Sequence, residues 1–282
     1  MYALQNGLVA TAADTTTVRM RNLNTGARLT TTVPTPQGVV PESGDAMVPG
    51  AAARGVAVGL TFCDPAGATT GKLLPTGSPV DQLESAAGPL PTSIVDAGAA
   101  AALVDAAALG LSAAESTEQL LAWIPELAQL RRRAALAAGM VAETDPVSYA
   151  IPKVGLVGPA VDYALPSGHL VRANEYDLAV RMVSMHSPHP AIGLTSAVAV
   201  AAAAQIGRSV VARCAAHRPD LTRLRLGTLA GVVTVDVEAS PSGTPRAVTL
   251  QRAARRIATA ELLVPVSSLL TPQTATTPGW AS

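Results

Sequence analysis

The amino-acid sequence predicts an α+β fold in which strands dominate and a few helices are grouped apart from them. The first ninety residues consist of short apolar stretches separated by turns rich in Gly, Pro, Asn and Asp. Helical character is concentrated in residues 112–139 and 191–206. Strands and helices that are segregated along a chain favour an α+β fold over a regularly alternating parallel sheet.

Composition and charge exclude several classes of function. Of the 282 residues, 49% are hydrophobic and 14% are charged, which is typical of a globular protein. The 20 basic and 20 acidic residues cancel and only 2% are aromatic, so a nucleic-acid partner is not expected. The two cysteines, Cys63 and Cys214, form no CxxC motif and are expected to be reduced, mostly packed thiols of a cytoplasmic protein.

Turn residues mark the ends of the strands that are predicted in the first region. Residues 15–34 alternate in polarity and break at Asn24-Thr25-Gly26, which predicts a β-hairpin. Residues 55–67 predict a strand that ends in a turn at Asp64-Pro65.

The second region begins near Pro91 and mixes strands with helices. Residues 92–111 predict two apolar strands joined by a glycine turn, and residues 152–163 predict a buried strand. A short amphipathic helix is expected within residues 169–184, and a hairpin of alternating strands around the turn at 241–243.

The helix expected over residues 112–139 has recognisable end signals. Ser112 followed by Glu115 fits a capping box, and Gly139 fits a C-terminal stop. The run Arg131-Arg132-Arg133 lies late in this helix, where the helix dipole favours positive charge, and is expected to form a solvated face.

Residues 191–206 are predicted to form a helix buried in protein rather than a membrane span. The run is shorter than the roughly 20 residues that a span requires. Its polar members Thr195, Ser196 and Gln205 also oppose insertion into a bilayer. A helix that is apolar all round lies inside a core, and alanine lets other elements approach it closely.

Two histidines before this helix, His186 and His189, allow three interpretations. Their spacing can place two imidazoles on one helix face for zinc, but prolines interrupt the segment and no Cys, Asp or Glu follows within ten residues. Structural hydrogen bonding and contact with a ligand remain as alternatives. Position favours a ligand, because the segment leads into a helix start near Thr195-Ser196, whose unpaired N–H groups attract a carboxylate.

Taken together, several segments resemble the PrpF family of isomerases. They occur in the family's order and spacing over residues 1 to about 265, and comprise residues 18–34, 47–77, 92–98 ("TSIVDAG"), 152–163, 181–204 and 224–239. The resemblance implies the diaminopimelate-epimerase-like fold, with two similar halves, each a curled sheet around a central helix, and an active site between them. It also implies an enzyme that moves protons and double bonds in small unsaturated polycarboxylates such as 2-methylaconitate, without cofactor or metal.

The resemblance also implies a division of the chain and a set of binding residues. Residues 1–90 would be the remainder of the first half, residues 91–265 the second half with its central helix at about 191–206, and residues 266–282 a loose tail. The substrate-binding residues would be Ser184, Met185, His186, His189, Thr195 and Ser196, the last standing where glycine is usual. A small polycarboxylate is the expected partner, neither nucleic acid nor membrane is expected, and a homodimer is left open.

The sequence also departs from the family's pattern. Members carry a long N-terminal piece, with an Arg-Gly-Gly-Thr-Ser-Lys-like motif and a Cys-Gly-Asn motif, before the segment that matches residues 2–9. The first half is therefore expected to be incomplete, as in a truncated form of a longer enzyme, and the catalytic residues are unknown. Lys72 and Cys63 do not replace the family's lysine and cysteine by position.

Two cleft motifs are altered as well. Ala99-Ala100 stands where the family has Asn-Pro, and residues 227–231 read Gly-Thr-Leu-Ala-Gly instead of Gly-His-Pro-Ser-Gly. These departures leave three hypotheses. The chain is a PrpF-type isomerase, a catalytically incomplete relative that binds a carboxylate or a partner protein, or a chain whose missing half is supplied by a second chain.

Overall fold

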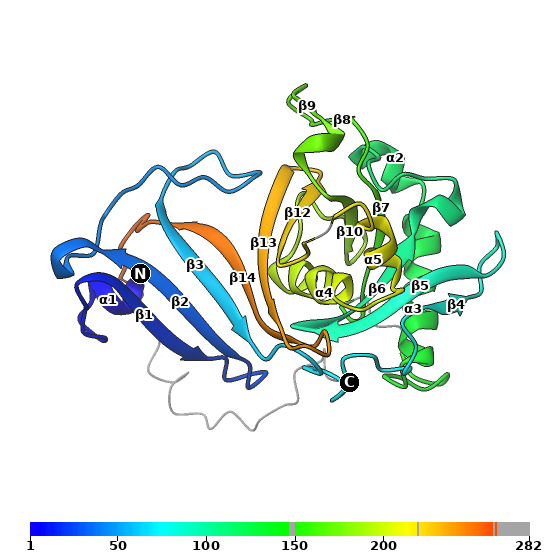
Figure 1. Cartoon of the computed structure of the whole chain (residues 1–282), viewed down its shortest axis with the longest axis horizontal. Helices are drawn as coiled ribbons and strands as arrows, with labels where there is room; N and C mark the ends of the chain where they lie inside the picture. Colours follow the sequence, from blue (N-terminus) through cyan, green and yellow to red (C-terminus); the bar gives the residue numbers. More distant parts are fainter. Residues whose placement is uncertain (147–149, 219, 262, 264–282) are drawn as a thin grey trace.

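The computed structural model describes residues 1–146, 150–218, 220–261 and 263, and confirms that strands dominate (Figure 1). The strands are β1 (Asp14–Arg21), β2 (Arg28–Thr35), β3 (Val56–Cys63), β4 (Asp81–Leu83), β5 (Leu90–Ala97), β6 (Ala99–Asp105), β7 (Lys153–Pro159), β8 (Tyr163–Ala164), β9 (Leu170–Val171), β10 (Leu178–Ser184), β11 (Ser187–Pro188), β12 (Arg223–Thr228), β13 (Gly231–Ala239) and β14 (Pro245–Ala254). The helices are α1 (Tyr2–Gln5), α2 (Thr117–Leu121), α3 (Ile124–Ala137), α4 (Leu194–Ala204) and α5 (Val210–Cys214).

One long sheet organises these strands. Its order is β1-β2-β3-β14-β13-β12-β10-β7-β6-β5-β4, with β11 paired to the end of β10. Neighbours are antiparallel except for the pairs β6–β7 and β10–β12. The sheet curls so far that Ala66, which follows β3, forms a bridge with Ala97 at the end of β5. The strands from β14 to β5 therefore wrap around α4, as Figure 1 shows.

Helix α4 fills the space inside this curl. All of its residues from Ser196 to Ala204 are buried, and they pack against side chains such as Val95, Met182 and Val235. Its alanines keep the helix thin enough for strands to surround it, because each lacks atoms beyond Cβ. The predicted buried helix is confirmed, with an observed start three residues later than residue 191.

A second core lies on the opposite face of the same strands. Leu127, Leu130 and Ala134 of α3 join Ile94 and Leu156 of the sheet in this core. The solvated arginine face predicted for 131–133 is wrong for Arg131, which is 1% exposed. Its position four residues after Leu127 and three before Ala134 places it on the side of α3 that packs against the sheet, and tertiary packing overrides the preference of arginine for water.

The helical region of residues 112–139 also begins later than predicted. Ser112 does bond to Glu115, but this contact closes a turn, and the capping box that starts α2 pairs Ser116 with Gln119. Two helices form instead of one, because α3 starts afresh at Ile124 with a proline in its first turn. The stop at Gly139 is confirmed by its φ of +65°.

The predicted helix within residues 169–184 is wrong. The chain there forms β9, a single 3-10 turn at Ala173–Glu175, and the buried strand β10. Six of the seven residues of β10 are buried, and a strand covered on both faces has no alternating pattern to reveal it.

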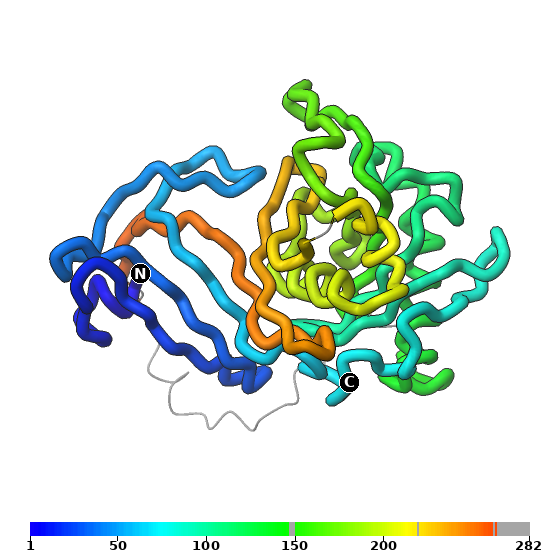
Figure 2. Tube along the Cα trace, viewed as in Figure 1, coloured from blue at the N-terminus to red at the C-terminus, as the bar shows by residue number. Residues whose placement is uncertain are grey.

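The predicted hairpins are confirmed. β1 and β2 are joined through the turn at Asn24-Thr25-Gly26, and β13 and β14 through the turn at 241–243. Figure 2 shows the consequence for the chain path: β14, close to the end of the described chain, runs beside β3. A C-terminal strand thus completes the sheet that the first ninety residues begin.

The outer strands β1, β2 and β3 have a small core of their own, made by Leu4, Val18, Val33, Val56 and Val58. Leu4 belongs to the four-residue helix α1, which is much shorter than the eleven-residue α4 that the other strands surround. The division into residues 1–90 and 91–265 stays a prediction, and the predicted tail of 266–282 lies outside the described residues.

Candidate functional site

The start of α4 has unpaired N–H groups and a positive dipole end, which favour an anionic ligand. Gly193 is the N-cap residue and no side chain caps the helix. The first intrahelical bond comes from the N–H of Ala197 to the carbonyl of Gly193, at 2.9 Å. The earlier N–H groups of this eleven-residue helix carry the positive end of its dipole, which favours a negatively charged group.

His189 and Ser196 border the same space beside Gly193. A Cβ atom built on Gly193 would lie 3.5 Å from Ser196 Oγ and 3.8 Å from His189 Nε2. A hydroxyl and an imidazole nitrogen therefore approach one point at the helix start. Both groups can donate a hydrogen bond to an oxygen atom there.

The protonation state of His189 follows from its surroundings. The backbone N–H of Ala191 donates to Nδ1 at 3.1 Å, so a neutral ring carries its proton on Nε2. Burial lowers the pKa of His189, and the positive charge of Lys153 lowers it further. His189 is thus held as a neutral donor facing the start of α4.

The turn between β5 and β6 closes against the same helix start. Gly98 has a φ of +70°, and a Cβ there would lie 3.1 Å from Val198 Cγ1 and 3.6 Å from Thr195 Cα. Its N–H donates to the carbonyl of Pro65 at 2.9 Å, which ties the end of the β3 segment to this turn. Gly98 is needed here because both the left-handed backbone and the close approach disfavour a side chain.

Asp96 anchors the loop that follows β3. Its carboxylate Oδ2 accepts hydrogen bonds from the N–H of Thr69, from the N–H of Thr70 and from Thr70 Oγ1, at 2.5–2.9 Å. The backbone of Asp96 also bonds to Gly67 and Leu73. The predicted glycine turn is confirmed, because β5 and β6 pair directly on either side of Gly98. The hydrogen bonds of Asp96 also link this turn to Thr69 and Thr70, which lie about thirty residues earlier in the chain.

The predicted binding residues separate into two groups. His189, Thr195 and Ser196 meet at the start of α4, whereas Met185 is 57% exposed in the turn between β10 and β11. Ser184 and His186 are exposed beside it. Met185 has a φ of +55°, and the guanidinium Nη1 of Arg131 donates to its carbonyl at 3.1 Å.

Two residues near this site were not among the predicted binding residues. Arg131 lies in a run of three arginines that suggested only solvent exposure. Lys153 is one of only two lysines in the sequence, which made it a candidate for lysine chemistry, and it begins an otherwise apolar strand.

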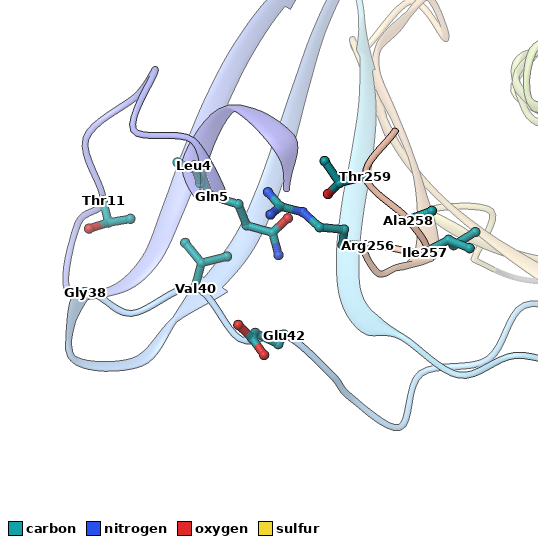
Figure 3. Close-up of a pocket in the computed structure, with 10 residues that line it drawn as sticks. All are labelled: Leu4, Gln5, Thr11, Gly38, Val40, Glu42, Arg256, Ile257, Ala258 and Thr259. Carbon is teal, nitrogen blue, oxygen red and sulfur yellow. The ribbon is translucent and has the colours of Figure 1, made fainter. Parts of the chain in front are cut away.

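Cavities do not by themselves identify a site in this molecule. A cavity of about 280 Å³ lies between the turn at 25–28, residues 62–68 and Gly98, close to the start of α4. A larger cavity of about 700 Å³ lies beside α1, away from α4 (Figure 3). Figure 3 shows Arg256 directed toward Gln5, with Glu42 on another wall. We favour the α4 region because several donors converge there.

Within residues 1–146, 150–218, 220–261 and 263 there is neither a candidate metal cluster nor a candidate membrane helix. No three His, Cys, Asp or Glu side chains in these ranges are grouped so that they could hold a metal ion. No helix in the same ranges is long and apolar enough to cross a membrane. Cys63 and Cys214 are free thiols, and burial raises the pKa of Cys214 to about 12.

Comparison with solved structures defines the class of protein. The chain matches the crystal structure of methylitaconate-delta-isomerase with a TM-score of 0.86 and 28% sequence identity, over 96% of this chain and 72% of that one. The protein therefore has the fold of a diaminopimelate-epimerase-like α+β isomerase, which confirms the predicted fold class.

The particular family follows from the sequence. The family model described as "PrpF protein" matches residues 1–265, and the chain belongs to this family. It is 30% identical to 3-methylitaconate isomerase of Eubacterium barkeri over 266 residues, which is 91% of this chain and 69% of the relative. It is 33% identical to 2-methyl-aconitate isomerase of Cupriavidus necator over 231 residues, 79% of this chain and 58% of the relative. The homologues are isomerases, as the resemblance implied.

Proposed function

We propose that the protein is an isomerase that shifts a double bond, or changes its cis-trans geometry, in a small unsaturated di- or tricarboxylate. The convergence of His189 Nε2 and Ser196 Oγ on the uncapped start of α4 is the observation that carries this proposal. The names of the relatives, methylitaconate, methyl-aconitate and oxalomesaconate isomerases, support the substrate class. The free thiols support a reducing, cytoplasmic location.

The site suits a carboxylate for chemical reasons. Removal of an allylic proton leaves a dienolate whose charge spreads onto a neighbouring carboxylate. Hydrogen-bond donors that are already in place stabilise this charge as it develops. Here the donors would be the hydroxyl of Ser196, the Nε2–H of His189 and the first N–H groups of α4. The group that removes the proton is left unassigned.

A second candidate function is carboxylate binding without turnover. The sequence of the β5–β6 turn favours this second function. Ala99-Ala100 follows Gly98, which lies against the start of α4, and the two alanines offer no polar side chain to a ligand there. In addition, His189 accepts an N–H at Nδ1, so the ring is arranged to donate rather than to remove a proton.

Solvent exchange separates the two functions. The 282-residue chain is incubated in D2O with cis-aconitate and with methylated analogues, and proton NMR follows both deuterium uptake and isomer formation. Uptake or isomer formation above the protein-free control supports the isomerase. Thermal stabilisation by the same compounds without exchange supports the binding protein.

A pair of serine variants tests the location of the site. Ser196→Ala should weaken the stabilisation by about 1 kcal/mol, the usual contribution of one hydrogen bond. Ser242→Ala, in the exposed β13–β14 turn, is the control and should leave it unchanged. Equal stabilisation of Ser196→Ala and wild type would place the carboxylate elsewhere.

A further inference from the structure

Lys153 is placed at the same end of the sheet as the start of α4. It is the first residue of β7 and pairs with Ala101 of β6, while its neighbour Val154 pairs with Val183, the residue before Ser184. Side chains alternate between the two faces of a strand. Lys153 therefore shares a face with Val157, which lies in the core around α4, and not with Val154, which lies in the opposite core.

Lys153 has a positively charged neighbour and a neutral histidine nearby. The guanidinium of Arg131 approaches from α3 and, together with burial, which has the larger effect, lowers the pKa of Lys153. On the other side, Lys153 lowers the pKa of His189. The half-buried ammonium makes no hydrogen bond or ion pair with any residue in the described ranges.

This arrangement differs from those of two fully buried charged groups: the guanidinium of Arg181 donates to three backbone carbonyls, and the carboxylate of Asp177 has opposite charges beside it. The fully buried carboxylate of Asp177 pairs with Arg225 at 2.8 Å and with Arg218 at 3.3 Å, and the backbone N–H of Arg225 adds a further hydrogen bond. A charge that is partly withdrawn from water is costly unless an opposite charge approaches it. Arg131 beside Lys153 is positive and His189 is neutral, so a negatively charged ligand group would stabilise the ammonium.

We infer that Lys153 is a substrate-binding residue whose ammonium forms an ion pair with a carboxylate of the ligand held at the start of α4. The inference rests on the proposed function and deepens it. His189 contacts the helix start and interacts electrostatically with Lys153, so one ligand can reach both residues. A ligand with two or three carboxylates satisfies the ammonium and the helix start together. A ligand with a single carboxylate satisfies them less well.

An ion-pairing lysine is distinguishable from a lysine that removes the substrate proton. An ion-pairing lysine stays protonated in the complex, and a bound carboxylate raises its pKa. A base is neutral when it acts, and its pKa does not need to rise on binding. Arginine can replace the first kind of lysine because it keeps the positive charge, whereas it cannot replace the second.

The binding experiment uses propane-1,2,3-tricarboxylate, which has no double bond and cannot isomerise. Calorimetry gives its Kd, and that of propionate, for wild type, Lys153→Met and Lys153→Arg. Lys72→Met is the matched control, because Lys72 is the only other lysine in the sequence and is exposed. We expect Lys153→Met to weaken tricarboxylate binding about tenfold or more, Lys153→Arg to weaken it less, and Lys72→Met to leave it unchanged.

A second measurement reads the charge of Lys153 directly and does not depend on a variant that folds. Reductive methylation with 13C-formaldehyde labels the two lysines and the terminal amine, and keeps their positive charge. NMR titration then gives the pKa of each group with and without the tricarboxylate. The pKa of dimethylated Lys153 should rise on binding, and the signal of Lys72 should not move.

The outcomes separate the inference from the proposed function. If wild type binds the tricarboxylate and Lys153→Met binds it equally, the role of Lys153 is overturned while the proposed function stands. If the pKa of Lys153 does not rise on binding, the ion pair is overturned, and a loss of turnover in Lys153→Arg would then indicate that the lysine is a base. If wild type binds no carboxylate, the proposed function and the inference fall together.

Discussion

The contact between Gly98 and α4 makes a sharp prediction about how the site is held in place. Gly98→Ala introduces two separate penalties. An L-residue in the left-handed conformation costs about 1–2 kcal/mol, and Gly98 has a φ of +70°. The new methyl group would also lie 3.1 Å from Val198 Cγ1 and 3.2 Å from Val198 Cβ, which is overpacking worth about 1–3 kcal/mol.

A second glycine allows the two penalties to be measured apart. Gly110 also has a φ of +70°, but a Cβ there meets no atom within 4 Å. Gly110→Ala should therefore lose only the backbone penalty of about 1–2 kcal/mol, whereas Gly98→Ala should lose about 2–5 kcal/mol. Urea denaturation of both variants gives the two free energies of unfolding, and their difference isolates the contact with α4.

The same variant tests whether this contact positions the carboxylate site. If Val198 moves to accommodate the methyl group, Thr195 and Ser196 move with the first turn of α4, and the affinity for propane-1,2,3-tricarboxylate should fall in Gly98→Ala but not in Gly110→Ala. Equal losses of stability in the two variants would refute the reasoning, because the turn would then exert no pressure on the helix.

Three further predictions concern buried groups. Arg131→Met removes the charged hydrogen bond to the Met185 carbonyl, so it should lower the free energy of unfolding in urea by about 1.5–3 kcal/mol. His189 has a folded-state pKa below its usual value of 6.5, so the unfolded chain binds a proton first as the pH falls. Stability should decrease from pH 6.5 down to the folded pKa, and His189→Gln should flatten this part of the curve. The Cys214 thiol, with a pKa of about 12, should be about one part in ten thousand thiolate at pH 8 and should react with a disulfide reagent only on unfolding.

Each of these predictions has a contrary result. An Arg131→Met protein as stable as wild type would show that the buried guanidinium contributes nothing to the fold. A stability curve that rises as the pH falls below 6.5, and loses that rise in His189→Gln, would mean that the histidine gains a proton on folding. Rapid labelling of Cys214 in the native protein would contradict its raised pKa.

Local signals predicted much of the fold correctly. The hairpin at Asn24-Thr25-Gly26 and the end of α3 at Gly139 depend on backbone conformations that few residues adopt, so the residue type reveals them. The two wrong predictions have different causes. β10 is buried on both faces and lacks an alternating pattern, and Ser112–Glu115 is a real contact that closes a turn instead of capping a helix.

The sequence could predict only those residues of the candidate site that are close together in the chain. His189, Thr195 and Ser196 follow one another closely in the chain, so a helix start preceded by histidines was sufficient to find them. Lys153 comes from a different strand and Arg131 from a different helix. Their sequence context does not show that they lie near the start of α4, because that depends on which elements pack together.

The sequence by itself determined the alanine-rich helix, the turns and the family to which the chain belongs. These features reside in short stretches whose residue types leave little choice of conformation or burial. Only the tertiary structure decided that β14 closes the sheet against β3, that Gly98 packs on the first turn of α4, and that Lys153 lies between the charge of Arg131 and the ring of His189 in its electrostatic interactions. The physical reason is that electrostatic and packing energies depend on distances between segments, and those distances exist only once the chain has folded.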